Sequence, residues 1–149
     1  MKNIEKQLKH SMGTLIGRTS HAILNRLQKR FREEGHTITV EQWQLLINLN
    51  NTNDQFHQQL AENTFKEKST VTRILDGLEK KALIKRIADT KDRRQKRIRI
   101  TAKGRKLLDK VKPLAHDVQS RALNGLDVKR LGICQEILLQ IYGNITAGE

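Results

Sequence analysis

The sequence contains few cysteine and aromatic residues and no long apolar run, and each shortage excludes a class of protein. Its single cysteine, Cys134, excludes an internal disulfide framework and is typical of a reducing compartment. Aromatic residues make up 3%, too few for the stacking platforms that bind single-stranded nucleic acid. No apolar run approaches the roughly 20 residues of a membrane span, and the N-terminal MKNIEKQLKH lacks the apolar segment of a signal peptide. We therefore expect a cytoplasmic protein with no membrane association.

Sequence motifs for catalysis and metal binding are missing as well. The chain has no glycine-rich phosphate loop, no G-x-S-x-G and no H-E-x-x-H. It has no Cys-x-x-Cys, and its five histidines are scattered without metal-ligand spacing. We therefore expect no enzymatic activity, no catalytic residue, no metal site and no cofactor.

Positive charge is present in excess and is concentrated in one stretch. The whole chain of 149 residues has a net charge of +13, and residues 66–106, with 16 basic and 5 acidic residues, have a net charge of +11. Residues 107–149 have as many acidic as basic residues. A charge this localised on a chain of single-domain size indicates a surface that binds phosphates.

Apolar periodicity predicts a mainly helical protein. Residues 3–34 repeat apolar side chains every three or four positions, and Gly35 stands where such a helix ends. This apolar stripe is longer than one neighbour can cover, so a partner chain is a reasonable expectation. Thr39 and Gln42 form a capping-box pattern for a second helix, and residues 48–54 have the composition of a turn. A short helix follows, for which we expect an inward-facing Phe65.

The next segment predicts a helix-turn-helix unit that continues into a β-hairpin. A helix over residues 68–81 has one apolar side, and its other side carries short polar and basic residues near its start. Residues 83–88 and 96–100 alternate apolar and basic residues, as strands do, around a charged tip. We expect Arg97 and Arg99 to face solvent or phosphate. Two further helices follow, capped by Thr101 and Asp127, and Cys134 is expected to be buried on the apolar side of the last one.

The helix predicted over residues 68–81 carries side chains that suit a helix that reads the major groove of DNA. Ser69, Thr70 and Thr72 are short enough for the helix to approach the bases closely, and Arg73 is long enough to reach a guanine edge or a phosphate. An ordinary capped helix also places Ser and Thr near its start. For Ser69 alone the two interpretations are equally good, but Lys68 and the basic neighbours favour DNA for the set. The hairpin tip, Asp92-Arg93-Arg94, could insert an arginine into a narrow minor groove, or it could be a solvated turn.

The same residues resemble the MarR family of transcriptional regulators, which is named for multiple antibiotic resistance. The motif is KSTVTRILDGLEKK at residues 68–81, followed by Leu83-Ile84, Arg86 and Asp89, then Asp92-Arg93-Arg94, then ITAKG at residues 100–104. Order, spacing and predicted elements agree over about 40 residues. Two positions depart from the family pattern, because Ala82 replaces the usual glycine at the end of the helix and Thr90 replaces a common proline.

The resemblance implies a single domain over residues 1–149, with a winged helix-turn-helix lobe at residues 37–100. Residues 1–36 and 101–149 would be the dimerisation helices. In the wing, Arg94 would enter the minor groove, oriented by Asp92 together with Arg86. The expected function is sequence-specific regulation of transcription, most simply repression, by a homodimer on a palindromic operator that a small-molecule effector releases.

A different function is compatible with the net charge alone. A non-specific nucleic-acid-binding or architectural protein would also be basic. It would, however, spread its charge over the whole chain, whereas here the C-terminal third is neutral.

Overall fold

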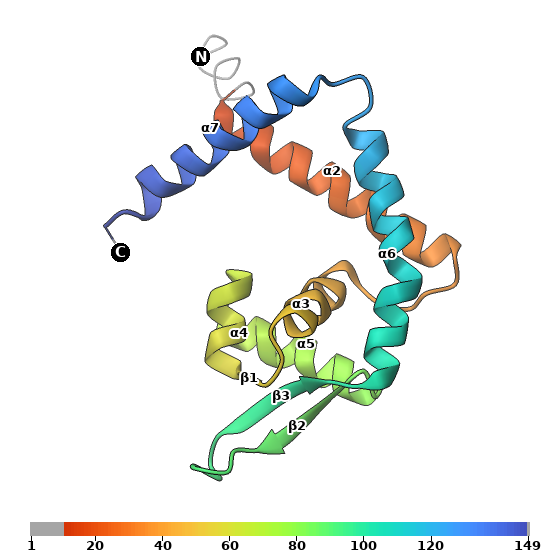
Figure 1. Cartoon of the computed structure of the whole chain (residues 1–149), viewed down its shortest axis with the longest axis vertical. Helices are drawn as coiled ribbons and strands as arrows, with labels where there is room; N and C mark the ends of the chain where they lie inside the picture. Colours follow the sequence, from red (N-terminus) through yellow and green to blue (C-terminus); the bar gives the residue numbers. More distant parts are fainter. Residues whose placement is uncertain (1–10, 149) are drawn as a thin grey trace, which may run out of the picture. The chain divides into compact units, whose positions relative to one another are not determined.

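The structure, a computed structural model, describes residues 11–148 and divides into two compact units, with the division between Val118 and Gln119. The first unit contains α2 (Met12–Glu33), α3 (Val40–Asn51), β1 (Gln55–Phe56), α4 (His57–Thr64), α5 (Lys68–Lys80), β2 (Ile84–Ala88), β3 (Lys96–Ile100) and most of α6 (Ala102–Ala122). The second contains the end of α6 and α7 (Val128–Thr146). The predicted fold class, mainly helical with a small antiparallel wing, is confirmed (Figure 1). The helix predicted over residues 3–10 lies outside the described residues.

The end of the first helix and the start of the second lie where the sequence indicates, whereas α2 begins at Met12, inside the stretch predicted as one helix over residues 3–34. Ser11 caps α2 by accepting a hydrogen bond from the backbone N–H of Thr14 at 3.3 Å. Gly35 follows the same helix with a φ of +76°, a left-handed conformation that glycine adopts without strain. Thr39 and Gln42 form the expected capping box at the start of α3, with side chain to backbone distances of 3.1 and 3.3 Å.

The helices α3, α4 and α5 pack as a helix-turn-helix unit around a single apolar core. α5 contributes four buried side chains to this core, namely Val71, Ile74, Leu75 and Leu78. Burial of each such side chain stabilises the fold by about 1.5–3 kcal/mol. One side of α5 is therefore held firmly in the core, and its opposite side is free to contact a ligand.

Two details of this unit differ from the prediction. The turn predicted over residues 48–54 is shorter, because α3 continues to Asn51 and Leu49 is fully buried. Phe65, predicted to face inward, is 79% exposed. It occupies a left-handed conformation with a φ of +53° directly after α4, and its N–H bonds back to Ala61 and Glu62. This turn directs the side chain away from the core.

The wing is an antiparallel hairpin of β2 and β3, extended to three strands by β1 in the order β1-β3-β2. The register pairs Ile84 with Ile100 and Arg86 with Ile98. Ile98 and Ile100 are buried, as the alternation predicts. The two-residue strand β1 was not predicted, because two residues are too few to show a period.

A close contact at the junction of the wing and α6 requires a glycine. Thr101 caps α6 as predicted, since its hydroxyl accepts from the N–H of Gly104 at 3.0 Å and donates to the carbonyl of Ala82 at 2.8 Å. A Cβ atom on Gly104 would lie 2.4 Å from the carbonyl oxygen of Leu83, closer than atoms can approach. The last part of the ITAKG motif is therefore a packing requirement.

The helix α2 exposes much of its apolar side. It buries Leu27 and Phe31, and the Phe31 ring packs edge-on against Trp43 with 6.0 Å between centroids. Toward its N-terminal end, four large apolar side chains are 37–53% exposed, namely Met12, Leu15, Ile16 and Ile23.

In the second unit, Asp127 is the N-cap of α7 as predicted, and its carboxylate accepts a hydrogen bond from the N–H of Arg130. None of its residues, all of which are described, is fully buried. Cys134 was expected to be buried and is exposed instead, because the apolar side of α7 is open in the chain by itself. No helix in the described part of the chain is long and apolar enough to span a membrane.

Candidate nucleic-acid interface

The outer side of α5 carries the residues that were predicted to read the major groove, which are called the reading residues below. Lys68, Ser69, Thr72 and Arg73 are exposed, and Thr70 is partly buried. The N-cap of α5 is Glu67, which makes no side-chain hydrogen bond to the helix start. Ser69 and Thr70 are therefore not the capping residues of this helix, and the purely structural interpretation of Ser69 loses its basis.

A histidine of α4 orients one of these side chains. The Thr72 hydroxyl donates its hydrogen to the carbonyl of Lys68 at 3.0 Å, so it can only accept from His57 Nε2, 2.9 Å away. Nε2 must then carry the hydrogen. Burial, together with the charges of Arg86 and Lys68, lowers the pKa of His57 and favours the neutral ring. The neutral ring thus holds the Thr72 side chain in one rotamer.

Two arginines of the candidate site are paired with acids of the same unit. Arg73 Nη2 lies 3.0 Å from Glu41 Oε2, and both side chains are well exposed. Arg86 bridges two carboxylates of α5, Asp76 and Glu79, at 2.7 Å each, and its side chain is only 20% exposed. The structure therefore places Arg86 between β2 and α5, where it couples the wing to α5, and not beside Asp92 as the resemblance suggested.

The tip of the wing is organised by a buried carboxylate. Asp89 is 6% exposed and accepts hydrogen bonds from the N–H groups of Lys91 and Asp92 at 3.2 and 3.1 Å. Its other oxygen accepts from Arg97 Nε at 2.6 Å. The hydrogen bond from Arg97, followed by that from the Asp92 N–H, holds the pKa of Asp89 below its usual value. Asp89 thus fixes the turn that projects the tip.

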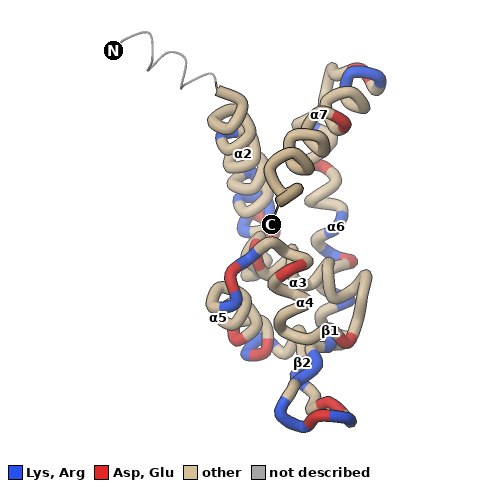
Figure 2. Tube along the Cα trace, turned by 90° about the vertical axis from the view of Figure 1, so that its left-hand side faces the viewer, with Lys and Arg blue, Asp and Glu red and all other residues tan. Residues whose placement is uncertain are grey.

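Asp92 positions Arg94 through the backbone. Its Oδ1 accepts from the N–H of Arg94 at 3.0 Å, an Asx-type turn. The prediction implied an ion pair between the side chains of Asp92 and Arg94, and the described residues show no such pair. Arg93 and Arg94 are exposed at the tip, which is the part of the hairpin farthest from the helices of the first unit in Figure 1 and carries both basic and acidic residues in Figure 2.

Arg97 and Arg99 do not face solvent freely, contrary to prediction. Arg99 makes two hydrogen bonds to the carboxylate of Asp54, at 2.5 and 2.6 Å, and these hold the pKa of Asp54 below its usual value. Arg97 lies over the Phe56 ring, 4.5 Å from its centroid, and donates to Asp89. The two arginines therefore fasten β3 to β1 and to the base of the wing.

Four residues that hold α5 and the wing in place were not predicted to do so. They are Asp54, Gln55, His57 and Asp89, of which Asp89 was named only as part of the family motif. Gln55 is 2% exposed and has both ends of its amide bonded, to Asn48 and Thr52 on one side and to Asn63 on the other. An acid at the end of a strand, followed by turn residues, was the available signal for Asp89. His57 and Gln55 had no comparable signal.

No cluster of three or more metal-binding side chains occurs in residues 11–148. The ion pairs at α5 and the wing are arginine–carboxylate pairs. The arrangement presents a helix, a projecting tip and a basic surface.

Comparison with known proteins agrees with this geometry. The family model described as the MarR family matches residues 38–96. The transcriptional regulator PA3341 is 32% identical, with 91% of this chain and 98% of that chain covered and a TM-score of 0.78. E. coli MarR, in a mutant form complexed with operator DNA, is 18% identical over 91% of this chain and 96% of that chain, with a TM-score of 0.83. BpsR of Bordetella bronchiseptica, whose DNA binding is regulated by 6-hydroxynicotinic acid, is 19% identical over 90% and 94%, with a TM-score of 0.82. At 18% and 19% identity, the similarity to E. coli MarR and to BpsR shows a shared fold and nothing more.

Proposed function

The chain belongs to the MarR family of transcriptional regulators, and we propose that it is a repressor that binds a palindromic operator in double-stranded DNA as a homodimer. The observation that carries the proposal is the outer side of α5. Short polar residues and two cations are exposed there on a helix whose other side is locked in the core. This is the form that a major-groove reading helix takes.

Each reading residue has a separate task. Ser69 and Thr70 lie in the first turn of α5, where the helix comes closest to the bases. Thr72 is held by His57, so it presents its hydroxyl group in one orientation. Lys68 and Arg73 supply charge, and the exposed pair between Arg73 and Glu41 is weak enough, at about 0–1 kcal/mol, for a phosphate or a guanine to replace the carboxylate.

The wing supplies the second contact. Arg94 at the tip would enter the minor groove beside the major-groove site, and Arg93 would contact the backbone. Asp92 and Asp89 fix the turn that carries both. Because Arg86 lies inside this assembly, with its guanidinium on Asp76 and Glu79, its contribution to DNA binding would be to position the wing and α5 together.

Dimerisation is supported by the apolar surfaces that the chain leaves open. α2 exposes Met12, Leu15 and Ile16, and α7 exposes apolar residues along its whole length, among them Ile137, Leu139 and Ile145. Exposed apolar stripes of this extent are typical of interfaces between chains. Residues 37–100 would form the DNA-binding lobe, and residues 1–36 and 101–149 the dimerisation helices. Two reading helices would then enter major grooves about one helical turn, roughly 34 Å, apart.

Release by a small-molecule effector is supported by BpsR, which has the same fold and whose DNA binding responds to 6-hydroxynicotinic acid. An effector that binds better to a form with the wrong spacing of reading helices would shift the population away from DNA. A difference in binding free energy of a few kcal/mol is sufficient.

A competition titration tests the proposal. A labelled duplex from the region upstream of the gene is bound to the protein and then challenged with unlabelled random-sequence DNA of equal length. We expect at least a 100-fold excess of random DNA to be needed for half displacement, because specific binding exceeds non-specific binding by about 10³ or more. Equal competition by both DNAs would instead indicate a non-specific basic protein.

The same titration separates the wing from general charge. Arg94→Gln should weaken binding about tenfold, and Asp92→Ala should weaken it by a smaller factor because the turn loosens. Arg130→Gln removes the same charge from exposed α7 and should leave affinity unchanged. If Arg130→Gln weakened binding as much as Arg94→Gln, the wing would not be the contact.

A further inference from the structure

The side chain of His57 has more capacity for hydrogen bonding than the fold uses. His57 is the first residue of α4, and it is partly exposed. Its Nε2 atom donates to the Thr72 hydroxyl at 2.9 Å, and that hydroxyl donates in turn to the carbonyl of Lys68 at 3.0 Å. Since Thr72 and Lys68 are both reading residues, the ring lies one hydrogen bond away from the surface that would face DNA.

The second ring nitrogen, Nδ1, is the atom that a ligand could use. In a neutral ring with its hydrogen on Nε2, Nδ1 carries a lone pair and no hydrogen. Within residues 11–148, no acceptor side chain bonds this nitrogen. Protonation would turn Nδ1 into a donor and would leave the bond from Nε2 to Thr72 intact. The ring can therefore gain a contact to an anion without disturbing the reading residue.

Two cations act on the ring in the free protein. Burial is the largest cause that lowers the pKa of His57 below its ordinary value of 6.5, followed by the charges of Arg86 on β2 and Lys68 on α5. The carbonyl of Lys68 acts in the opposite direction, as an acceptor close to the ring. Arg86 is itself paired with Asp76 and Glu79 of α5. At pH 7 the ring is therefore neutral, and it lies beside positive charges that attract phosphate.

A DNA phosphate at this position would reverse the balance of charge. It would pair with Lys68, which cancels the repulsion between Lys68 and the ring, and one of its oxygens would accept from a protonated Nδ1. An opposite charge within about 4–6 Å changes a pKa by roughly 1 or more toward the charged form. Histidine is the side chain that such a change moves across neutral pH.

We propose that His57 is a further DNA-binding residue, whose ring joins Thr72 to a backbone phosphate and takes up one proton from the solvent when the phosphate binds. The proposal rests on the proposed function for the place of DNA on α5. Phosphate contacts carry no sequence information, so His57 would contribute to the binding of any duplex. It would increase the affinity for DNA and make that affinity depend on pH.

The direction of the pH dependence follows from the two pKa values of His57. The pKa is below 6.5 in the free protein and higher in the complex, so the extra affinity is fully present below the lower value and is lost as the pH rises through the higher one. A pKa that is higher by about 1 strengthens binding up to tenfold per protomer. With two protomers on the DNA, we expect binding to be about tenfold tighter at pH 6 than at pH 8.

Fluorescence anisotropy titration of a labelled random-sequence duplex, at fixed salt concentration and at pH 6 and pH 8, tests the proposal. His57→Gln should lose most of the dependence on pH that the wild type shows. At pH 8 its affinity should match that of the wild type within about twofold, because a glutamine amide also donates to Thr72. A histidine that only holds Thr72 would leave the two proteins with the same pH dependence. That result, or no pH dependence in the wild type, would overturn the proposal.

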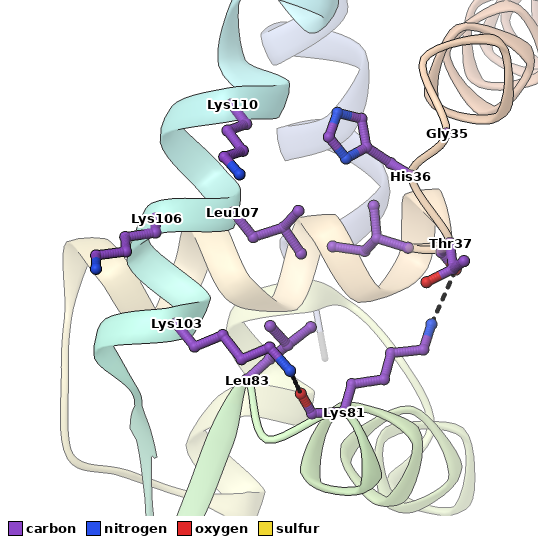
Figure 3. A pocket seen from close by; sticks show the side chains of 10 residues that line it. Gly35, His36, Thr37, Lys81, Leu83, Lys103, Lys106, Leu107 and Lys110 are labelled. Carbon is purple, nitrogen blue, oxygen red and sulfur yellow. Dashed lines mark hydrogen bonds between the residues drawn. The ribbon is translucent and has the colours of Figure 1, made fainter.

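His36→Gln is the matched control. His36 lies in the link between α2 and α3, and it borders a pocket together with Lys81, the residue that directly follows α5 (Figure 3). The 13 residues of α5, about 20 Å of helix, separate this end from Lys68. His36→Gln should therefore keep the pH dependence of the wild type. Loss of the dependence in His36→Gln, with none lost in His57→Gln, would place the titrating group at His36 and contradict the proposal.

An NMR titration of the His57 ring in the wild-type protein measures the proton directly and does not depend on how well a variant folds. The pKa of His57 should be below 6.5 without DNA and higher by about 1 in the complex with the duplex. An unchanged or lower pKa in the complex would overturn the proposal.

Sequence preference and pH dependence keep the two proposals apart. If the wild type preferred a selected duplex over random DNA but bound each equally well at pH 6 and pH 8, the proposed function would stand and the His57 contact would fail. If it bound all duplexes equally, with the expected dependence on pH and on His57, the contact would stand and the proposed function would fail.

Discussion

Replacement of Ala82 by glycine should make the protein more stable. Ala82 follows α5 with a φ of +56°, and the helix end is closed by two hydrogen bonds, from the N–H of Ala82 to Glu79 and from the N–H of Leu83 to Leu78. This is the left-handed helix-end motif in which glycine is the preferred residue. The MarR pattern usually has glycine here, and the structure shows that alanine adopts the same strained conformation.

The size of the effect follows from two opposing terms. A left-handed conformation costs an alanine about 1–2 kcal/mol relative to glycine. Glycine loses about 0.4–1 kcal/mol more conformational entropy on folding. The difference predicts that Ala82→Gly raises the free energy of unfolding by about 0.5–1 kcal/mol. For a chain of this length that corresponds to an increase in Tm of about 1–4 °C.

Urea unfolding followed by circular dichroism measures this difference. Ala88→Gly is the matched control, because Ala88 is an exposed residue of β2 in the same unit, with ordinary strand geometry. There the same substitution should lower stability by about 0.5–1 kcal/mol. If both variants were destabilised to the same extent, the strain at Ala82 would not be real and the account of the helix end would be wrong.

Three further predictions follow from the contacts around the reading elements. Gln55→Leu should lower the free energy of unfolding by about 1–3 kcal/mol, because it leaves the buried amide partners of Gln55 without hydrogen bonds, whereas Gln58→Leu at an exposed position should have little effect in the same urea assay. Arg86→Gln should weaken DNA binding without changing its dependence on salt, because its partners are protein carboxylates, whereas Arg94→Gln should reduce the slope of log K against log salt concentration by about 1; equal slopes for both variants would show that Arg86 contacts DNA. The pKa values of Asp54 and Asp89 are lowered in the folded state by Arg99 and Arg97, so their contribution to stability is present above the ordinary value of 3.8 and is lost as the pH falls below it. In the same urea assay, the double variant Asp54→Asn/Asp89→Asn should therefore lose less stability between pH 5 and pH 2.5 than the wild type. An equally steep loss in both proteins would contradict the assignment.

Much of the fold was predictable because local signals agreed with the tertiary structure. The capping box of Thr39 and Gln42, the helix end at Gly35 and the alternation of Ile98 and Ile100 each specify an element boundary or a buried face without reference to distant residues. The predicted reading residues of α5 and the tip of the wing lie on the surfaces expected for them.

The errors at the three wing arginines have a common cause, since each arginine has its partner in a different element or loop of the fold. Arg97 and Arg99 look solvated in a basic strand, but Asp54 is more than 40 residues earlier and comes beside them only when β1 pairs with β3. Arg86 resembles a wing residue, and the acids that hold it belong to α5. Phe65 was misplaced for a different reason, because its left-handed backbone reverses the direction that helical periodicity predicts.

Selection of DNA from a pool of randomised duplexes tests the central claim most directly. Repeated binding and amplification with the full-length protein should enrich an imperfect inverted repeat whose half-sites are centred about one helical turn, roughly 10 base pairs, apart. The same selection with Thr70→Ala/Thr72→Ala should lose the preference at some half-site positions while the protein still binds DNA. Enrichment of no sequence by the wild-type protein, despite tight binding to the pool, would contradict the reading function assigned to α5.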